Sequence, residues 1–133
     1  MAAGINILVN DGGAPARIMK VGNAGADLDA GTIVELNSSG AVIAASEDLP
    51  SLLHAIGVLF VDATSGDPAS VLTGSGVIVY LKATGTIAAG DKLGHDAAGL
   101  AKAATTGDER FAIALEAKAT SGTHSGFVKA LLL

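Results

Sequence analysis

Glycine recurs throughout the chain and limits its possible folds more than any other feature. The sequence has 18 glycines among 133 residues. Almost no window of a dozen residues carries an uninterrupted apolar stripe with helical spacing. Glycine is unfavourable inside a helix because it loses more backbone entropy on folding than other residues. The sequence therefore predicts short strands joined by turns, with one helical turn allowed at 46–53.

Short apolar runs alternate with turn-forming clusters along the whole chain. The clusters NSSG at 37–40 and DAAG at 96–99 each separate two such runs, and each reads as a hairpin turn with glycine at the position of positive φ. This spacing predicts an all-β protein, a small sandwich or barrel-like domain. The predicted strands cover residues 5–9, 17–21, 32–36, 41–45, 55–61, 76–83, 92–95, 100–103, 111–117 and 126–132.

The hydrophobic core is expected to be thin. The chain is long enough for one domain, but 26 alanines and 18 glycines bring little buried area, and only four residues are aromatic. Assembly with other subunits is therefore an expected source of stability. Alternation along the matched strands predicts that eight side chains point inward: Ile56, Val58, Phe60, Val77, Val79, Ile113, Leu115 and Val128.

The sequence also resembles itself. AGTIVEL at 30–36, followed by Gly40, matches AGDKL at 89–93, followed by Gly99. Further along, AIGV at 55–58 matches AIAL at 112–115, and ATSG at 63–66 recurs identically at 119–122. The order of the matches is kept while the offset shrinks, which is typical of a repeat with deletions. We expect an internal repeat of two similar strand-turn-strand units at about 30–81 and 89–132.

This ordered pattern resembles the decoration, or cement, proteins of tailed-phage capsids, including the lambda head-decoration type. Members of that family show AGD before a short strand and AIGV or AIAL before a long one. The resemblance covers about 17–132 and is strongest at 85–132, whereas Thr32 stands where the family usually has Asp. It implies a β-tulip-like fold. The chain length predicts a single domain, at 16–133, and Gly12, Gly13 and Pro15 separate it from an extended N-terminal arm at 1–15.

Composition excludes several classes of function. The absence of cysteine excludes disulfides, thiolate metal sites and cysteine nucleophiles. The net charge of −5 arises from scattered residues, and no basic cluster suits nucleic acid. The N-terminus has no basic region typical of a signal peptide, and the longest uncharged apolar stretch, 49–61, is far short of the roughly 20 residues needed to span a bilayer. We expect synthesis in the host cytoplasm and no membrane partner.

A few polar residues have the chemistry of a metal-binding or acid-base site. His95 beside Asp96, with Asp91 nearby, fits a metal or acid-base pair, but a solvated turn explains these residues better. Asp27 and Asp29 fit a weak calcium site, although capping of the following turn is favoured.

Two glycine-rich loops partly match known functional motifs. The loop at 85–92 lacks the lysine and helix of a phosphate-binding loop, and GSG at 74–76 only superficially resembles a serine elbow. We expect no catalytic, cofactor-binding or metal-binding residues, and no enzyme activity.

The N-terminal arm carries an apolar run formed by Ile5, Ile7, Leu8 and Val9. Such a run fits an edge strand of the protein's own sheet, or a strand added to the sheet of a partner, because an unpaired strand must have its backbone groups satisfied. We expect the second, with these four residues binding the capsid and with the arm mobile in the free protein.

The function implied by the resemblance is structural. The protein is expected on the outer surface of the virion, where it binds the major capsid protein lattice and stabilises the head. It is also expected to bind itself, as a homotrimer by preference or as a dimer. The alternative is a phage fibre, tail or receptor-binding β module, since such modules share the Gly- and Ala-rich composition.

Overall fold

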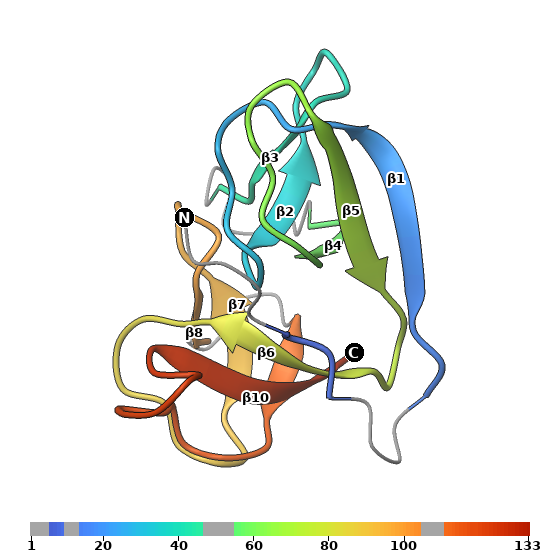
Figure 1. Cartoon of the computed structure of the whole chain (residues 1–133). Coiled ribbons are helices and arrows are strands. Elements are labelled where there is room, and N and C mark those ends of the chain that lie inside the picture. The colour runs from blue at the N-terminus through green and yellow to red at the C-terminus, as the bar shows by residue number, and fades with distance from the viewer. Residues whose placement is uncertain (1–5, 10–13, 47–54, 105–110) are drawn as a thin grey trace.

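In the computed structural model, the described residues form ten β-strands in two antiparallel five-stranded sheets (Figure 1). It describes residues 6–9, 14–46, 55–104 and 111–133, so nearly all of the helical turn predicted at 46–53 lies outside the described residues. The first sheet contains β1 (Arg17–Asn23), β2 (Ile33–Leu36), β3 (Val42–Ala44), β4 (Gly57–Leu59) and β5 (Pro68–Thr73). The second contains β6 (Ile78–Lys82), β7 (Lys92–His95), β8 (Ala101–Ala103), β9 (Ala112–Ala114) and β10 (Phe127–Leu132). The all-β prediction is confirmed, and neither sheet closes into a barrel within the described residues.

The two sheets have the same strand order. The first runs β1-β5-β4-β2-β3 and the second runs β6-β10-β9-β7-β8, so each strand of the second sheet corresponds to the strand five positions earlier. The chain passes from one sheet to the other between Thr73 and Ile78. The repeat predicted from the sequence places its boundary after residue 81, later in the chain than the boundary between the sheets. It assigns 76–81 to the first copy, whereas β6 belongs to the second sheet.

The turns and sheet ends correspond as well. In both sheets a polar side chain organises the turn between the fourth and fifth strands along the sheet, β2 and β3 in the first and β7 and β8 in the second. Asn37 Oδ1 accepts bonds from Ser39 N and Ala41 N, and Asp96 Oδ1 accepts bonds from Ala98 N and Leu100 N. Each sheet also curls, so that the residue after its first strand bridges a distant strand. These bridges are Ala24 with Val42 and Ala83 with Ala101.

The predicted strands agree with the structure at nine of the ten positions. The hairpin turns at 37–40 and 96–99 are confirmed by the pairing of β2 with β3 and of β7 with β8. Segment 5–9 contributes one isolated bridge at Leu8 and no full strand among its described residues. β5 was not predicted, because Pro68 opens it and the small residues Ala69 and Ser70 follow. Proline is nevertheless tolerated as the first residue of a strand.

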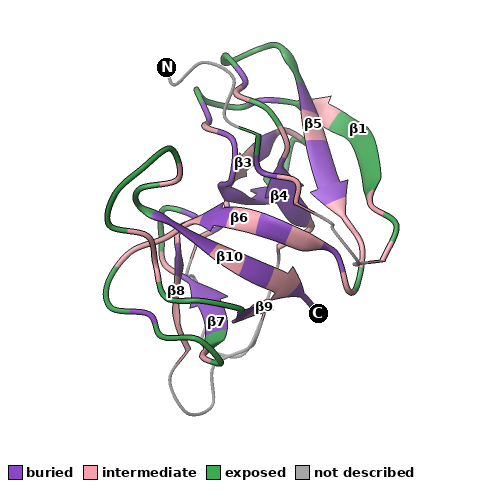
Figure 2. Ribbon diagram, turned by 60° about the horizontal axis from the view of Figure 1, so that its bottom comes forward, coloured by how far each residue is buried: buried purple, intermediate pink, exposed green. Residues whose placement is uncertain are grey.

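The main hydrophobic core lies between the sheets. Ile33, Val58 and Leu72 of the first sheet belong to one cluster with side chains of the second sheet such as Leu93 and Val128, and all five are fully buried. The first sheet has a further cluster on its opposite face, formed mainly by residues Val34, Val42, Leu59, Ala69 and Val71. The first sheet is therefore covered on both faces, and Figure 2 shows buried residues along β4 and β5.

The core prediction was half correct. Val58, Val77, Val79 and Val128 are fully buried, and Ile56 and Phe60 are partly buried. The prediction was wrong for β9, where Ala112 and Ala114 face the core, Ile113 is only partly buried, and Leu115 is 41% exposed. Ile113 lies on the face of the second sheet opposite to the main core, whereas its counterpart Val58 faces the other sheet.

Backbone contacts join the two sheets at two glycines with positive φ. Ile33 N donates to Gly99 O over 2.9 Å, and a Cβ at Gly99 would lie 2.4 Å from Ile33 O. Lys82 N donates to Gly31 O over 3.0 Å, and a Cβ at Gly31 would lie 2.7 Å from Phe127. Glycine is required here both for its φ, 73° at Gly99 and 90° at Gly31, and for the close approach.

Candidate interaction surface

The N-terminal segment lies along the outer edge of β6. Leu8 bridges Val79 in antiparallel fashion, Val9 N donates to Ile78 O over 3.1 Å, and Tyr80 N donates to Ile7 O over 2.8 Å. The Ile7 side chain is fully buried in the main core. Residues 6–9 therefore complete the edge of the second sheet.

An aromatic contact holds the same segment from a second side. The His124 ring stacks on Tyr80 with centroids 3.8 Å apart and planes 11° from parallel. His124 Nε2 lies 3.0 Å from Asn6 O, within hydrogen-bonding distance. The segment is thus fixed both by strand pairing and by the loop that precedes β10.

This placement differs from the predicted mobile arm. Of the four residues assigned to capsid binding, Ile5 lies outside the described residues, and Ile7, Leu8 and Val9 lie together on β6. The structure therefore shows the alternative role of the apolar run, an edge segment of the protein's own sheet. Capsid binding by the arm stays a prediction, and it requires these residues to leave β6.

The strand β1 is the exposed counterpart of β6, and its exposure was not anticipated. Six of its seven residues are exposed, and the large apolar side chains of Ile18, Met19 and Val21 are 47%, 42% and 39% accessible. Figure 2 shows β1 as an exposed ribbon beside the buried β5. The sequence signal was present, because RIMKV places apolar residues on both faces of one strand.

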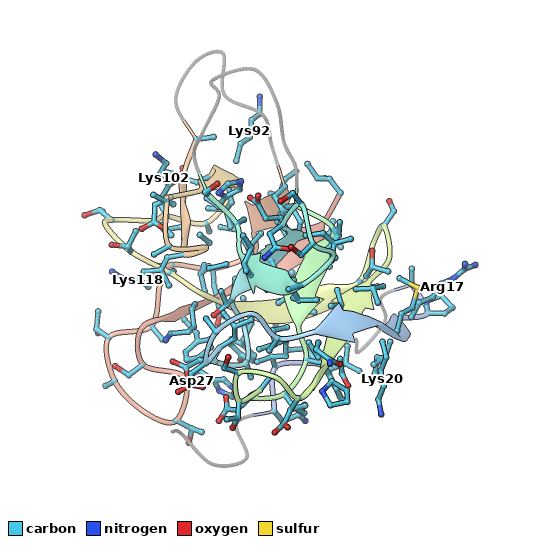
Figure 3. The ribbon with its side chains drawn as sticks, turned by 90° about the horizontal axis from the view of Figure 1, so that it is seen from above. Arg17, Lys20, Asp27, Lys92, Lys102 and Lys118 are labelled. Atoms are coloured by element: carbon cyan, nitrogen blue, oxygen red, sulfur yellow. The ribbon has the colours of Figure 1, made fainter. Side chains whose placement is uncertain are left out.

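Cations accompany these apolar residues. Arg17 and Lys20 are both exposed, and Figure 3 shows both side chains pointing away from the ribbon. The salt bridge found within the described ranges joins Lys82 and Asp29, at 2.8 Å, so neither cation of β1 is paired with a described carboxylate. The outer edge of β1 is thus apolar and positively charged in a protein whose net charge is −5.

The polar residues weighed as metal or catalytic sites act as local hydrogen-bonding groups. His95 Nδ1 lies 2.9 Å from Asp96 O, and Asp91 Oδ2 accepts a bond from Ala88 N. Asp27 Oδ1 accepts a bond from Ser65 N, and Asp29 binds Lys82. Among the described side chains no three His, Asp or Glu residues are grouped so that they could hold a metal ion.

A hollow of about 180 Å³ lies near the C-terminus. Its lining includes Ile56, Phe111 and Leu132, with Thr73 and Ser75 as its hydroxyl groups and no acidic or basic side chain. The hollow therefore offers both apolar contact and hydrogen-bonding groups. In the part of the chain that the structure describes, no helix is long and apolar enough to cross a membrane.

Comparison with known proteins gives a consistent picture. Residues 14–130 match the model of a family described as phage cement protein. The fold is similar to the solved structure of the head fiber gp8.5 N base in bacteriophage phi29, with a TM-score of 0.66 and 16% sequence identity, over 90% of this chain and 95% of that one. At this identity the likeness shows the fold alone. A search of curated proteins found no match.

Proposed function

Because the chain belongs to the phage cement protein family, we propose that it binds the outer surface of the assembled major capsid protein lattice and stabilises the phage head. The family match carries this proposal, since it extends over residues 14–130 and so includes both sheets. Membership makes the chain a structural protein of the phage capsid. The role is non-enzymatic, and it needs no cofactor.

The physical properties of the chain support this role. A protein that decorates a shell gains strength from many identical contacts repeated over a lattice, so each contact can be weak. Such a protein needs an exposed strand or patch rather than a deep pocket, and β1 provides an exposed apolar strand. Reinforcing the shell from outside would help it to resist the pressure of the packaged genome.

The direct test is binding to heads that lack the protein. Purified protein is mixed with such heads and sedimented, and the bound fraction is measured against concentration. We expect saturable binding and heads that withstand higher temperature before releasing DNA. Protein that stays in the supernatant at every concentration would contradict capsid decoration.

The predicted role of the arm in capsid binding can be tested by locking it to β6. Leu8 and Val79 are directly opposite in an antiparallel bridge, a separation that suits a disulfide, and the chain has no other cysteine. If Ile5, Ile7, Leu8 and Val9 bind the capsid, the oxidised Leu8→Cys/Val79→Cys protein should lose binding to heads and regain it with reductant. Equal binding in both states would show that the arm stays on β6.

The oligomeric state is a separate part of the proposal. We propose a homotrimer, as the resemblance implies, with a dimer as the alternative. Sedimentation equilibrium of the free protein separates these from a monomer of 13.0 kDa. A monomer at all concentrations would leave assembly to the capsid lattice itself.

The second candidate is a fibre-related module. It is favoured by one observation, the likeness of the fold to the base of a head fiber. In that case the chain would join an appended fibre to the head. Cofractionation with heads supports either role, whereas cofractionation with tails would contradict both and favour a tail module.

A further inference from the structure

The outer edge of β1 has backbone groups that point away from the sheet. Lys20 is opposite Ser70 in the β1–β5 ladder. The Ser70 carbonyl accepts a bond from Phe60 N, 2.8 Å away, so Ser70 directs its backbone groups toward the β4 side. In an antiparallel ladder, Lys20, the residue opposite Ser70, then directs its own N–H and C=O away from β5. Ile18, two positions earlier in β1, directs its N–H and C=O the same way.

The corresponding edge of β6 shows what such groups bind. Tyr80 is opposite Lys129, whose carbonyl accepts a bond from Leu115 N, so Tyr80 holds in the second sheet the place that Lys20 holds in the first. Tyr80 N donates to Ile7 O, and Ile78 O accepts a bond from Val9 N. An extended apolar segment therefore occupies this edge of the second sheet.

The same edge of β1 is open among the described residues. No described segment forms a bridge or a backbone hydrogen bond with the outward groups of Ile18 and Lys20. The C-terminal end of β1 is covered by the first sheet's own β2–β3 hairpin. A Cβ at Gly22 would lie 2.4 Å from Gly40 O, and Ala24 bridges Val42. The open part is thus limited to about Arg17–Lys20, the length that residues 6–9 cover on β6.

We propose that the outer edge of β1 at Ile18 and Lys20 receives an extended segment of the capsid shell protein that carries a carboxylate among apolar residues. Strand addition satisfies the outward N–H and C=O groups. The apolar residues of the added strand cover Ile18 and Met19, and the carboxylate lies beside Arg17 or Lys20. This proposal rests on the proposed function, because it identifies a surface by which the protein binds the shell.

A second copy of this chain suits the edge less well. Its apolar N-terminal segment is already on its own β6, with Ile7 fully buried. Pairing of β1 with β1 of a second copy would bring two Arg17 and two Lys20 side chains into one strand pair without a carboxylate. Like charges in neighbouring strands are destabilising, and an acidic strand removes that cost.

The test uses Lys20→Pro in the full chain with heads that lack the protein. Proline has no N–H, and it is tolerated where the N–H of an edge strand faces outward. The variant should therefore keep the fold, measured by circular dichroism and melting, and bind heads about tenfold more weakly or worse. Lys20→Ala is the matched control: it removes the charge but keeps the N–H, and should bind more tightly than Lys20→Pro.

Should Lys20→Pro unfold, a charge-reversal variant and hydrogen exchange test the β1 proposal instead. Arg17→Glu/Lys20→Glu changes only exposed side chains, and it should weaken binding at low salt and lose that difference at high salt. In the wild type, the Lys20 amide should become protected from hydrogen exchange on heads. Head binding by folded Lys20→Pro that equals wild type would overturn the β1 proposal and leave the proposed function standing.

Two further outcomes distinguish failure of the proposed function from failure of the β1 proposal. Failure of the wild type to bind heads would overturn both the proposed function and the β1 proposal. A change in the oligomeric state of the free protein caused by Lys20→Pro, with head binding lost as a consequence, would show that a second copy occupies the edge. That result would overturn the shell segment as the occupant.

Discussion

The two sheets have one strand order but different interiors. The cross-strand pair Leu59 and Val71 in the first sheet corresponds to Ala114 and Ala130 in the second. Leu59 and Val71 belong to the separate cluster of the first sheet. Ala114 and Ala130 belong to the main core between the sheets. Alanine at these positions leaves room for side chains of the first sheet. The packing of one sheet on the other therefore decides which positions carry large side chains.

The edges differ in the same way. β6 is covered by residues 6–9 and contributes Val79 and Leu81 to the core, whereas the apolar residues of β1 are exposed. Among the described residues, one topology therefore gives one covered edge, at β6, and one open edge, at β1.

The largest effect is expected from Leu59→Ala. Leu59 is fully buried in the cluster of the first sheet, and its loss leaves a cavity. We expect the free energy of unfolding to fall by about 2–5 kcal/mol, measured by denaturant titration. Leu36→Ala, at a side chain that is 41% exposed, is the control and should cost less than about 0.5 kcal/mol. A loss for Leu59→Ala as small as the loss for Leu36→Ala would show that the separate core of the first sheet contributes nothing to the free energy of unfolding.

The next effect concerns the junction, compared through Gly99→Ala and Gly40→Ala. The two glycines occupy corresponding turns with φ of 73° and 83°, so both substitutions cost about 1–2 kcal/mol of backbone strain. Only the Cβ at position 99 meets the other sheet, at Ile33 O, which adds about 1–3 kcal/mol. Equal melting temperatures for the two variants would contradict the close contact between the sheets.

A smaller effect is expected from Ala114→Leu, which gives the second sheet the residue of the first. The added volume must displace side chains of the main core, at a cost of about 1–3 kcal/mol. Ala97→Leu, at an exposed turn position, should leave the unfolding midpoint nearly unchanged. Stabilisation by Ala114→Leu would mean that the core between the sheets is underpacked.

The smallest effect is expected from the ion pair that joins the sheets. Lys82 and Asp29 are 33% and 47% exposed, so solvent screens their attraction. Asp29→Asn should lower the free energy of unfolding by less than about 1 kcal/mol. The loss should shrink as salt is added. A loss that is large and independent of salt would show that Asp29 has a structural role beyond the pair.

Local sequence patterns predicted most of the fold. Alternation and glycine turns placed the strands, because both signals depend on a few neighbouring residues. The burial of Ile113 was predicted wrongly because it depends on which face of its sheet the other sheet covers. That information lies in contacts between residues far apart in the sequence.

The exposure of the candidate surface also depends on contacts between residues far apart in the sequence. The segment 17–21 was predicted as a strand, but the exposure of Ile18 and Met19 follows from the absence of a described neighbour beside β1. The apolar run at Ile7 and Leu8 was recognised, and its place on β6 rather than in solution is set by tertiary contacts.

The position of residues 6–9 has a consequence for the order in which the chain can be built. These residues emerge from the ribosome before β1 to β5, yet they pair with β6 and contact the loop at His124, which are made much later. The first sheet has all its strands and a core of its own by Thr73. We expect it to fold while synthesis continues, as domains and their parts often do from the N-terminal side. Protease protection of stalled nascent chains would then appear first over β1 to β5 and reach the N-terminal segment last.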